Sequence, residues 1–276
     1  MPKFRNVFEE CSFGKEMTQG SVFCGAKSHL YKNATIHGIV ITPRCDIAHK
    51  KVPFYHYLPM VRLEDWIGTE LPEIFICHLK NDALGILQSF FAEYHISINL
   101  LRRYNYSKIK KIIEDFKKEH SDKAKAIDHR IKKTLKVLED LDKFESKGIG
   151  VEQLYSNYKS QKKNILKELI ENKNPHYYFI EYNDKKGGTY YIIRLKEINK
   201  LNPELFKEIS NGIDTPLSNK LLENSDIEQN SEGNIIMQLC VMRSPYIENL
   251  IQQFTQQFSR VGIDDFCPEL KNNILQ

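Results

Sequence analysis

The sequence predicts an α+β protein in which a small β-barrel or bent sheet is formed from both chain ends and carries an inserted helical hairpin. Three observations predict this class. Short aromatic and β-branched runs punctuated by Pro and Gly fill residues 20–63, which is typical of strands. Apolar residues recur at helical spacing over 64–172, and strand-like runs return from residue 175.

Two structural parts follow from this order. We expect residues 1–66 together with 175–276 to form a β-rich core, and residues 67–174 to form a helical excursion of long antiparallel helices. The apolar run at 235–242 supports one shared sheet, because a strand buried on both faces needs neighbours on both sides.

The first β part contains three expected strands, at 21–24, 36–42 and 52–58, and the last two end at Pro43 and Pro59. A glycine inside the second of these strands, Gly38, predicts a bulge or a close approach of another group to the backbone.

The middle segment has the 3.6-residue period of buried helices. We expect a helix from Pro72 to about Leu101, one long helix or two in tandem over 107–145, and a further helix over roughly 151–172.

The last part begins with two aromatic runs, 176–182 and 189–195, around a Gly-rich turn, which predict a β-hairpin. Asn202 is then expected to cap a short helix that ends at Gly212. Residues 214–233 are polar and predict a loop.

The final helix follows the expected strand at 235–242. Ser244 is expected to cap it, with Pro245 at its first helical position and Gly262 at its end. Its apolar stripe is Ile247, Leu250, Ile251, Phe254 and Phe258.

Composition excludes several classes. The 276 residues hold no apolar run near the roughly 20 residues that span a bilayer, and the N-terminus lacks the apolar stretch of a secretory signal. The six cysteines form no close pairs and are expected to be buried thiols of a cytoplasmic protein.

The net charge of +4 is uneven, since residues 107–172 hold 17 Lys and Arg against 12 Asp and Glu. This excess fits either a nucleic-acid partner or a solvated helix face. The lysines at 108–118 likewise fit either contacts to a nucleic-acid backbone or a solvated helix face. The tyrosines of the 176–195 hairpin are expected either to belong to the core or to stack on the bases of a single strand.

The densest polar cluster spans residues 42–51, directly after an apolar strand. Arg44, His49, Lys50 and Lys51 predict a phosphate or nucleic-acid site. The alternative is a strand-end turn that Asp46 caps and solvated basic residues follow. If the loop is a binding site, Asp46 is one of its binding residues.

Two other chemistries use residue types that the same loop contains. Cys45 and His49, with Cys24, His29 or His37, offer zinc ligands, but no pair has the close spacing of a structural zinc site. Cys45 beside Arg44 would also serve as a nucleophile. We expect neither a metal nor a cofactor.

Three segments, Gly20 to Phe23, Gly38 to Pro43 and Tyr57 to Pro59, resemble the opening of the PemK-like (MazF-type) small barrels. The resemblance implies an SH3-like barrel and a metal-independent endoribonuclease that cleaves single-stranded RNA. Thr42 matches a functional position of the family. The family has an Arg-Pro pair just before its second strand, where this chain has Ile36 and His37, and His37 would replace that arginine as a proton donor. In that enzyme His37 or His49 would be the acid or base and Arg44 would stabilise the phosphorane.

A second resemblance joins the two chain ends. Residues 42–51 and 244–254, with Arg260 to Gly262, are similar to motifs of uncharacterised bacterial proteins, some beside phage-defence genes. It implies that the two ends pack together. Arg243 and Arg260 flank the last helix as expected binding residues, although Arg243 has Asp264 or Asp265 as alternative partners, and Gln252, Gln253, Gln256 and Gln257 fit either RNA edges or solvent.

Three functions therefore remain open. The favoured one is an accessory or effector subunit of a defence or toxin-like system that binds nucleic acid or a nucleotide through residues 42–51, without catalysis. The second is the PemK-like endoribonuclease. The third is a scaffold whose helices dock a larger protein, and either a protein complex or a homo-oligomer is expected, with no membrane association.

Overall fold

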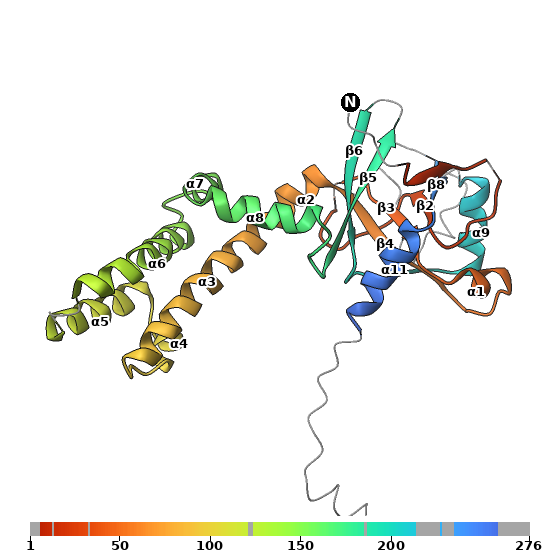
Figure 1. The fold of residues 1–276 in the computed structure, drawn as a ribbon. Coiled ribbons are helices and arrows are strands. Elements are labelled where there is room, and N and C mark those ends of the chain that lie inside the picture. The colour runs from red at the N-terminus through yellow and green to blue at the C-terminus, as the bar shows by residue number, and fades with distance from the viewer. Residues whose placement is uncertain are drawn as a thin grey trace, which may run out of the picture. The chain divides into compact units, whose positions relative to one another are not determined.

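A computed structural model describes residues 6–12, 14–32, 34–120, 124–184, 187–213, 227 and 235–258. The chain divides into two compact units, one of Met1–Asp65 with Leu169–Gln276 and one of Trp66–Glu168. All of the described strands belong to the first unit, and the second is built from helices (Figure 1).

The strands form one curled antiparallel sheet with the order β1-β8-β2-β3-β4-β6-β5, and β7 pairs with one end of β4. Both chain ends contribute, because β8 lies between β1 and β2 while β6 lies beside β4. The predicted α+β class with a bent sheet is confirmed. The strands are β1 Phe8–Glu10, β2 Ser21–Cys24, β3 His37–Val40, β4 Tyr55–Arg62, β5 Tyr177–Asp184, β6 Gly187–Arg194, β7 Asn199–Leu201 and β8 Gln238–Met242.

The end predicted for the third strand is wrong, because Pro59 lies inside β4. Its partner across the ladder is Gly38 of β3. On the other edge, β4 pairs with β7 up to Tyr57 and with β6 from Met60 onward. Pro59 therefore lies where β4 changes partner, and the missing N–H of a proline is tolerated at such a break in a ladder.

The hairpin is confirmed, since β5 and β6 pair in register from Tyr177 and Arg194 to Asp184 and Gly187. Its two turn residues lie outside the described part of the chain. The expected loop at 214–233 also lies outside it, except that Ile227 bridges to Ala26. The strand expected at 235–242 is present as β8 over its last five residues.

The described residues of the first unit also form the helices α1 Arg44–Ala48, α9 Pro203–Asn211 and α11 Tyr246–Gln256. The Asn202 cap of α9 is confirmed, because its side chain accepts a hydrogen bond from the N–H of Leu205 at 2.7 Å. The cap predicted for α11 is wrong, because Pro245 occupies that position and Ser244 bonds to Glu248 instead. Gly262, the expected end of this helix, lies outside the described residues.

The core of the first unit lies between the sheet and α11. Ile39 and Leu58 of the central strands, Ile193 of β6 and the Ile247 and Leu250 pair of α11 are all buried in one cluster. The predicted stripe of α11 therefore packs on the sheet with its first turns, whereas Phe258 beyond its end is exposed.

The second unit contains shorter helices than predicted. The helix expected at 72–101 is broken after Glu93, where His95 has a φ of 55°. The described residues of 107–145 form two helices, which is one of the two arrangements expected for them, and 151–172 is interrupted at Tyr158. The helices are α2 Leu63–Thr69, α3 Leu71–Glu93, α4 Asn99–Arg103, α5 Tyr106–Glu119, α6 Ala124–Glu145, α7 Val151–Asn157 and α8 Lys159–Ile170.

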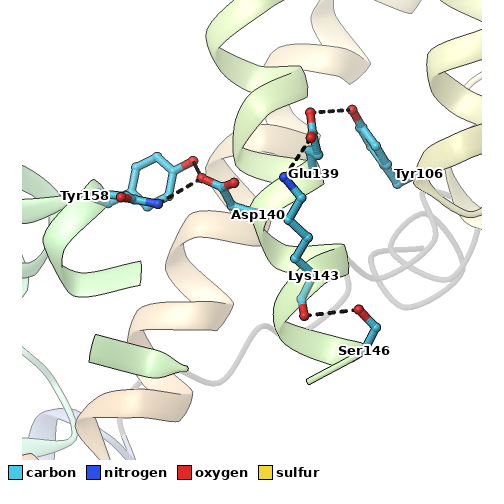
Figure 2. A network of polar contacts seen from close by, with 7 residues as sticks. Tyr106, Glu139, Asp140, Lys143, Ser146 and Tyr158 are labelled. Carbon is cyan, nitrogen blue, oxygen red and sulfur yellow. Dashed lines mark hydrogen bonds and ion pairs between the residues drawn. The ribbon is translucent and has the colours of Figure 1, made fainter. Parts of the chain in front are cut away.

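A polar network explains the interruption at Tyr158 (Figure 2). The buried carboxylate of Asp140 on α6 accepts hydrogen bonds from the Tyr158 hydroxyl at 2.8 Å and from the Asn157 amide at 3.2 Å. Burial and the bond to Asp140 raise the pKa of Tyr158. The neighbouring residue Glu139 accepts a hydrogen bond from Lys143 at 2.8 Å, and burial together with the nearby Glu139 charge raises the pKa of Tyr106 to about 12.

Asp140→Ala is expected to lower the free energy of unfolding of the helical unit by about 2 kcal/mol, because it removes the charged acceptor of two hydrogen bonds, one of them from the half-buried Tyr158 hydroxyl. Urea denaturation followed by circular dichroism measures this change. Asp142→Ala, which removes an exposed carboxylate from the same helix, is the control and should shift stability by less than about 0.5 kcal/mol. Equal midpoints for wild type and Asp140→Ala would contradict the assigned role.

Candidate nucleic-acid interface

The helix α1 is a short turn of backbone that directly follows β3. The carbonyl of Pro43 accepts hydrogen bonds from the N–H groups of Asp46 and Ile47, at 3.0 and 3.1 Å. Lys50 then adopts a φ of 50°, and the N–H of Lys51 bonds back to the carbonyl of Asp46 at 3.1 Å. These backbone bonds hold the loop in a compact form without help from its side chains.

The side chains of the loop point outward. Arg44, His49, Lys50 and Lys51 are exposed, and Asp46 is half-buried. The interpretation of Asp46 as a cap is wrong, because α1 has no side-chain cap and Asp46 stands in its first turn.

Thr42 anchors the start of the loop to β4. Its hydroxyl oxygen accepts a hydrogen bond from the N–H of His56 at 2.7 Å, and the residue is only 4 % exposed. The structure therefore gives Thr42 a positioning contact inside the sheet. His56 itself is exposed, so this contact places an imidazole beside the loop.

An exposed aromatic ring lies between the loop and the sheet. Phe54 follows Lys51 by three residues and is 40 % exposed. The ammonium of Lys200 lies 4.7 Å from the centre of this ring, and Lys200 is the ladder partner of His56 across β4 and β7. We call Lys50, Lys51, Phe54, His56 and Lys200 the basic-aromatic patch.

Arg44 connects the loop to α11. Its guanidinium lies 3.8 Å from a carboxylate oxygen of Glu248, and both side chains are 55 % exposed. The Ser244 hydroxyl donates to the same carboxylate at 2.5 Å and lowers the pKa of Glu248. An exposed ion pair is worth less than about 1 kcal/mol, so Arg44 loses little when it turns toward an anionic ligand.

The other expected binding residues do not join the loop. Arg243 pairs with Glu9 of β1 at 3.7 Å, and its N–H bonds the carbonyl of Val7, so it belongs to the β1–β8 edge. Arg260, Asp264 and Asp265 lie outside the described residues.

His37 also stands apart from α1. It begins β3, whereas α1 follows the far end of that strand, about 10 Å away at ~3.3 Å per residue. Its half-buried ring packs against Tyr191 at a centroid distance of 5.4 Å. Burial, aided by the charge of Arg62, lowers the pKa of His37 to about 4. The imidazole is therefore neutral at pH 7 and lacks the imidazolium proton that a general acid gives up.

The thiol and metal chemistries that the residue types of this loop allow have little support in the geometry. The exposed thiol of Cys45 donates a hydrogen bond to Asp46 Oδ1 at 3.7 Å, so the neighbour that the structure shows for it is a carboxylate and not a histidine base. Among the described residues, no group of three His, Cys, Asp or Glu side chains is placed to hold a metal ion.

Three members of the patch, Phe54, His56 and Lys200, are not among the site residues that the sequence predicts. Phe54 and His56 fall within the strand expected at 52–58. The signal that identifies them is alternation: Tyr55 and Tyr57 are buried, so their neighbours face the other side. Lys200 carries no such signal, because only the pairing of β7 with β4 brings it there.

Likeness to known proteins assigns no family to this chain. Comparison with family models, with characterised proteins and with solved structures finds no match. No helix in the described ranges is long and apolar enough to cross a membrane. The functional inference therefore depends on the chemistry of the basic-aromatic patch.

Proposed function

We propose that this protein binds single-stranded RNA through the basic-aromatic patch, without cleaving it. One observation carries the proposal: an exposed phenylalanine ring, Phe54, lies directly before β4 with the ammonium of Lys200 4.7 Å from its centre, and the exposed Lys50 and Lys51 precede it in the chain. Unpaired bases stack on such rings, and neighbouring lysines bind the phosphates on either side.

The electrostatics of the surface support a polyanionic partner. Lys50 and Lys51 are exposed, and Arg44 is held only by an exposed ion pair with Glu248. Lysines that contact phosphates release counterions when the strand binds, which makes affinity strongly dependent on salt. A phenylalanine contact, by contrast, contributes stacking energy that salt changes little.

The biological setting proposed for this binding is that of an accessory or effector subunit in a bacterial defence or toxin-like system. This part of the proposal rests on the resemblance of residues 42–51 and 244–254 to motifs of uncharacterised bacterial proteins, some of them encoded beside phage-defence genes. The Arg44–Glu248 contact agrees with the implied packing of these two segments. Docking of a protein partner on the helical unit is a further part of this proposal.

The test is the affinity of the protein for a labelled single-stranded RNA pool at several salt concentrations. Lys50→Ala/Lys51→Ala should weaken binding about tenfold at low salt and reduce the slope of log K against log salt by about 1.4, since each single-strand phosphate contact contributes ~0.7. Phe54→Ala should also weaken binding about tenfold through lost stacking, but should leave the slope unchanged.

The charge-matched control is Lys108→Ala/Lys111→Ala, which removes two exposed lysines from α5. It should bind like wild type. If this control loses affinity and the Lys50→Ala/Lys51→Ala variant does not, the interface lies on the helical unit and the proposal is wrong. RNA cleavage that disappears in His49→Ala would replace the proposal with the endoribonuclease.

A further inference from the structure

A polar cavity lies in the first unit, between the last turns of α11 and the turn that leads into β5. Its volume is about 320 Å³, within the range of roughly 300–1,000 Å³ that is typical of small-molecule sites. Its lining comes from Asn172 to His176, from Lys196 and from the glutamines at the end of α11. The proposed RNA surface does not use any of these residues.

Hydrogen bonds hold the walls of the cavity in place. Asn172, at a φ of 53°, exchanges two hydrogen bonds with the backbone of Phe179, at 2.5 and 3.1 Å. From the opposite wall, Gln253 donates to the carbonyl of Asn172 at 3.0 Å and Gln257 donates to the carbonyl of Pro175. The cavity is therefore preorganised, which reduces the entropy cost of binding.

The charge of the cavity favours an anion. Lys173 and Lys196 line it with exposed ammonium groups, and no Asp or Glu is among the described residues of its lining. Lys173 is paired with the neighbouring Glu171 at 2.6 Å, in an exposed contact that costs little to break. Two lysines at one mouth match a phosphate group.

The amides of the cavity favour a base. Gln253 donates to the backbone with its Nε2, and its Oε1 is buried without a hydrogen-bond partner in the part of the chain that the structure describes. An unpaired buried acceptor costs about 1–3 kcal/mol, which a ligand N–H recovers. Glutamine amides pair in a bidentate way with the N6 and N7 atoms of adenine, and Gln256 adds a second amide at the rim.

We propose that this cavity binds an adenine nucleotide, with the phosphate at Lys173 and Lys196 and the base at Gln253 and Gln256. The volume fits one nucleotide and not a longer strand. The nucleotide is either free or the 5′-phosphorylated end of an RNA. On this basis the row of glutamines on α11, for which the sequence allows either RNA edges or solvent, recognises a base.

Isothermal titration of the full chain with AMP, in the absence of RNA, tests the site independently of the basic-aromatic patch. We expect saturable binding of one AMP per chain. Lys173→Ala/Lys196→Ala should weaken it at least about tenfold, because both phosphate contacts are lost. Gln256→Ala should reduce the preference for AMP over UMP by about fivefold or more, in line with the ~1–3 kcal/mol of a bidentate base contact.

The control is Lys15→Ala/Lys207→Ala, which removes two exposed lysines that do not line the cavity, and it should bind AMP like wild type. A second titration compares an RNA that begins with adenosine, with and without its 5′ phosphate. Tighter binding of the phosphorylated RNA than of the same RNA without its phosphate assigns a strand end, and equal binding of the two assigns a free nucleotide.

Three results would overturn the proposal. These are the absence of saturable binding at millimolar AMP to folded protein, equal binding of inorganic phosphate or UMP, and equal weakening in the control variant. RNA affinity measured on the same variants keeps the two sites apart, because loss of AMP binding leaves the proposal for the basic-aromatic patch standing.

Discussion

Gly38→Ala is expected to lower the free energy of unfolding of the first unit by about 3 kcal/mol, the upper end of what overpacking of a core usually costs. A Cβ at this position would lie 2.3 Å from Cζ of Phe23 and 2.9 Å from Cδ2 of Tyr57. Both rings are fully buried and pack edge to face at a centroid distance of 5.1 Å. Neither ring has room to move away, so the strain falls on the pairing of β2, β3 and β4.

Urea denaturation followed by circular dichroism measures this loss. Gly85→Ala is the matched control, because Gly85 is an exposed residue inside α3 and a Cβ there meets no atom within 4 Å. Alanine should stabilise that helix by about 1 kcal/mol through its higher helix propensity. A Gly38→Ala variant as stable as wild type would show that the Phe23 ring does not lie against the backbone of Gly38.

Glu197→Gln is expected to cost about 3 kcal/mol of stability, because it leaves a buried guanidinium without its counter-charge. Glu197 forms an ion pair with Arg194, and the two side chains are only 11 % and 14 % exposed. The same carboxylate accepts hydrogen bonds from the Ser28 hydroxyl at 2.8 Å and from the N–H of His29 at 3.0 Å. The network thus ties the segment after β2 to the segment after β6.

Thermal and urea unfolding measure the effect, with Glu204→Gln at an exposed position of α9 as a control expected to change stability by less than about 0.5 kcal/mol. A double variant, Arg194→Met/Glu197→Leu, should be more stable than Glu197→Gln, since an apolar pair leaves no buried charge behind. If Glu197→Gln unfolds like the control, another group balances the charge of Arg194, and the network does not hold the two segments together.

Local chemistry explains which elements were predictable. The β5–β6 hairpin follows from two aromatic runs around a Gly-rich turn, and the α9 cap follows from Asn202 before Pro203. The close approach at Gly38 was also predicted, since a glycine inside an apolar strand often marks a point where another group meets the backbone. Each of these depends on residues near one another in the chain, where propensity and hydrogen bonding act directly.

Other boundaries were wrong because distant partners set them. Pro59 stays inside β4 because the strand exchanges β7 for β6 beside it. Tyr158 interrupts a helix because Asp140, 18 residues earlier, holds its hydroxyl. Periodicity and capping preferences carry no information about such contacts.

The candidate site also combines features that the sequence predicts with features that depend on tertiary packing. Residues 42–51 were identified from their density of polar groups after an apolar strand, and four of their basic side chains are exposed in the structure. His37 was proposed from its place before that strand, but its burial against Tyr191 makes it neutral, an effect of packing that sequence does not reveal. Phe54 and Lys200 come together only through the β4–β7 ladder.

The sequence by itself determined the α+β class, the contribution of both chain ends to one sheet and the basic loop after β3, because hydrophobic period and turn residues act over short distances. Only the tertiary structure decided which groups share a surface. It brought Lys200 over Phe54, Arg44 to Glu248, and the glutamines of α11 to the lysines beside β5 and β6. Such contacts depend on strand order and helix placement, which arise from the packing of the whole core.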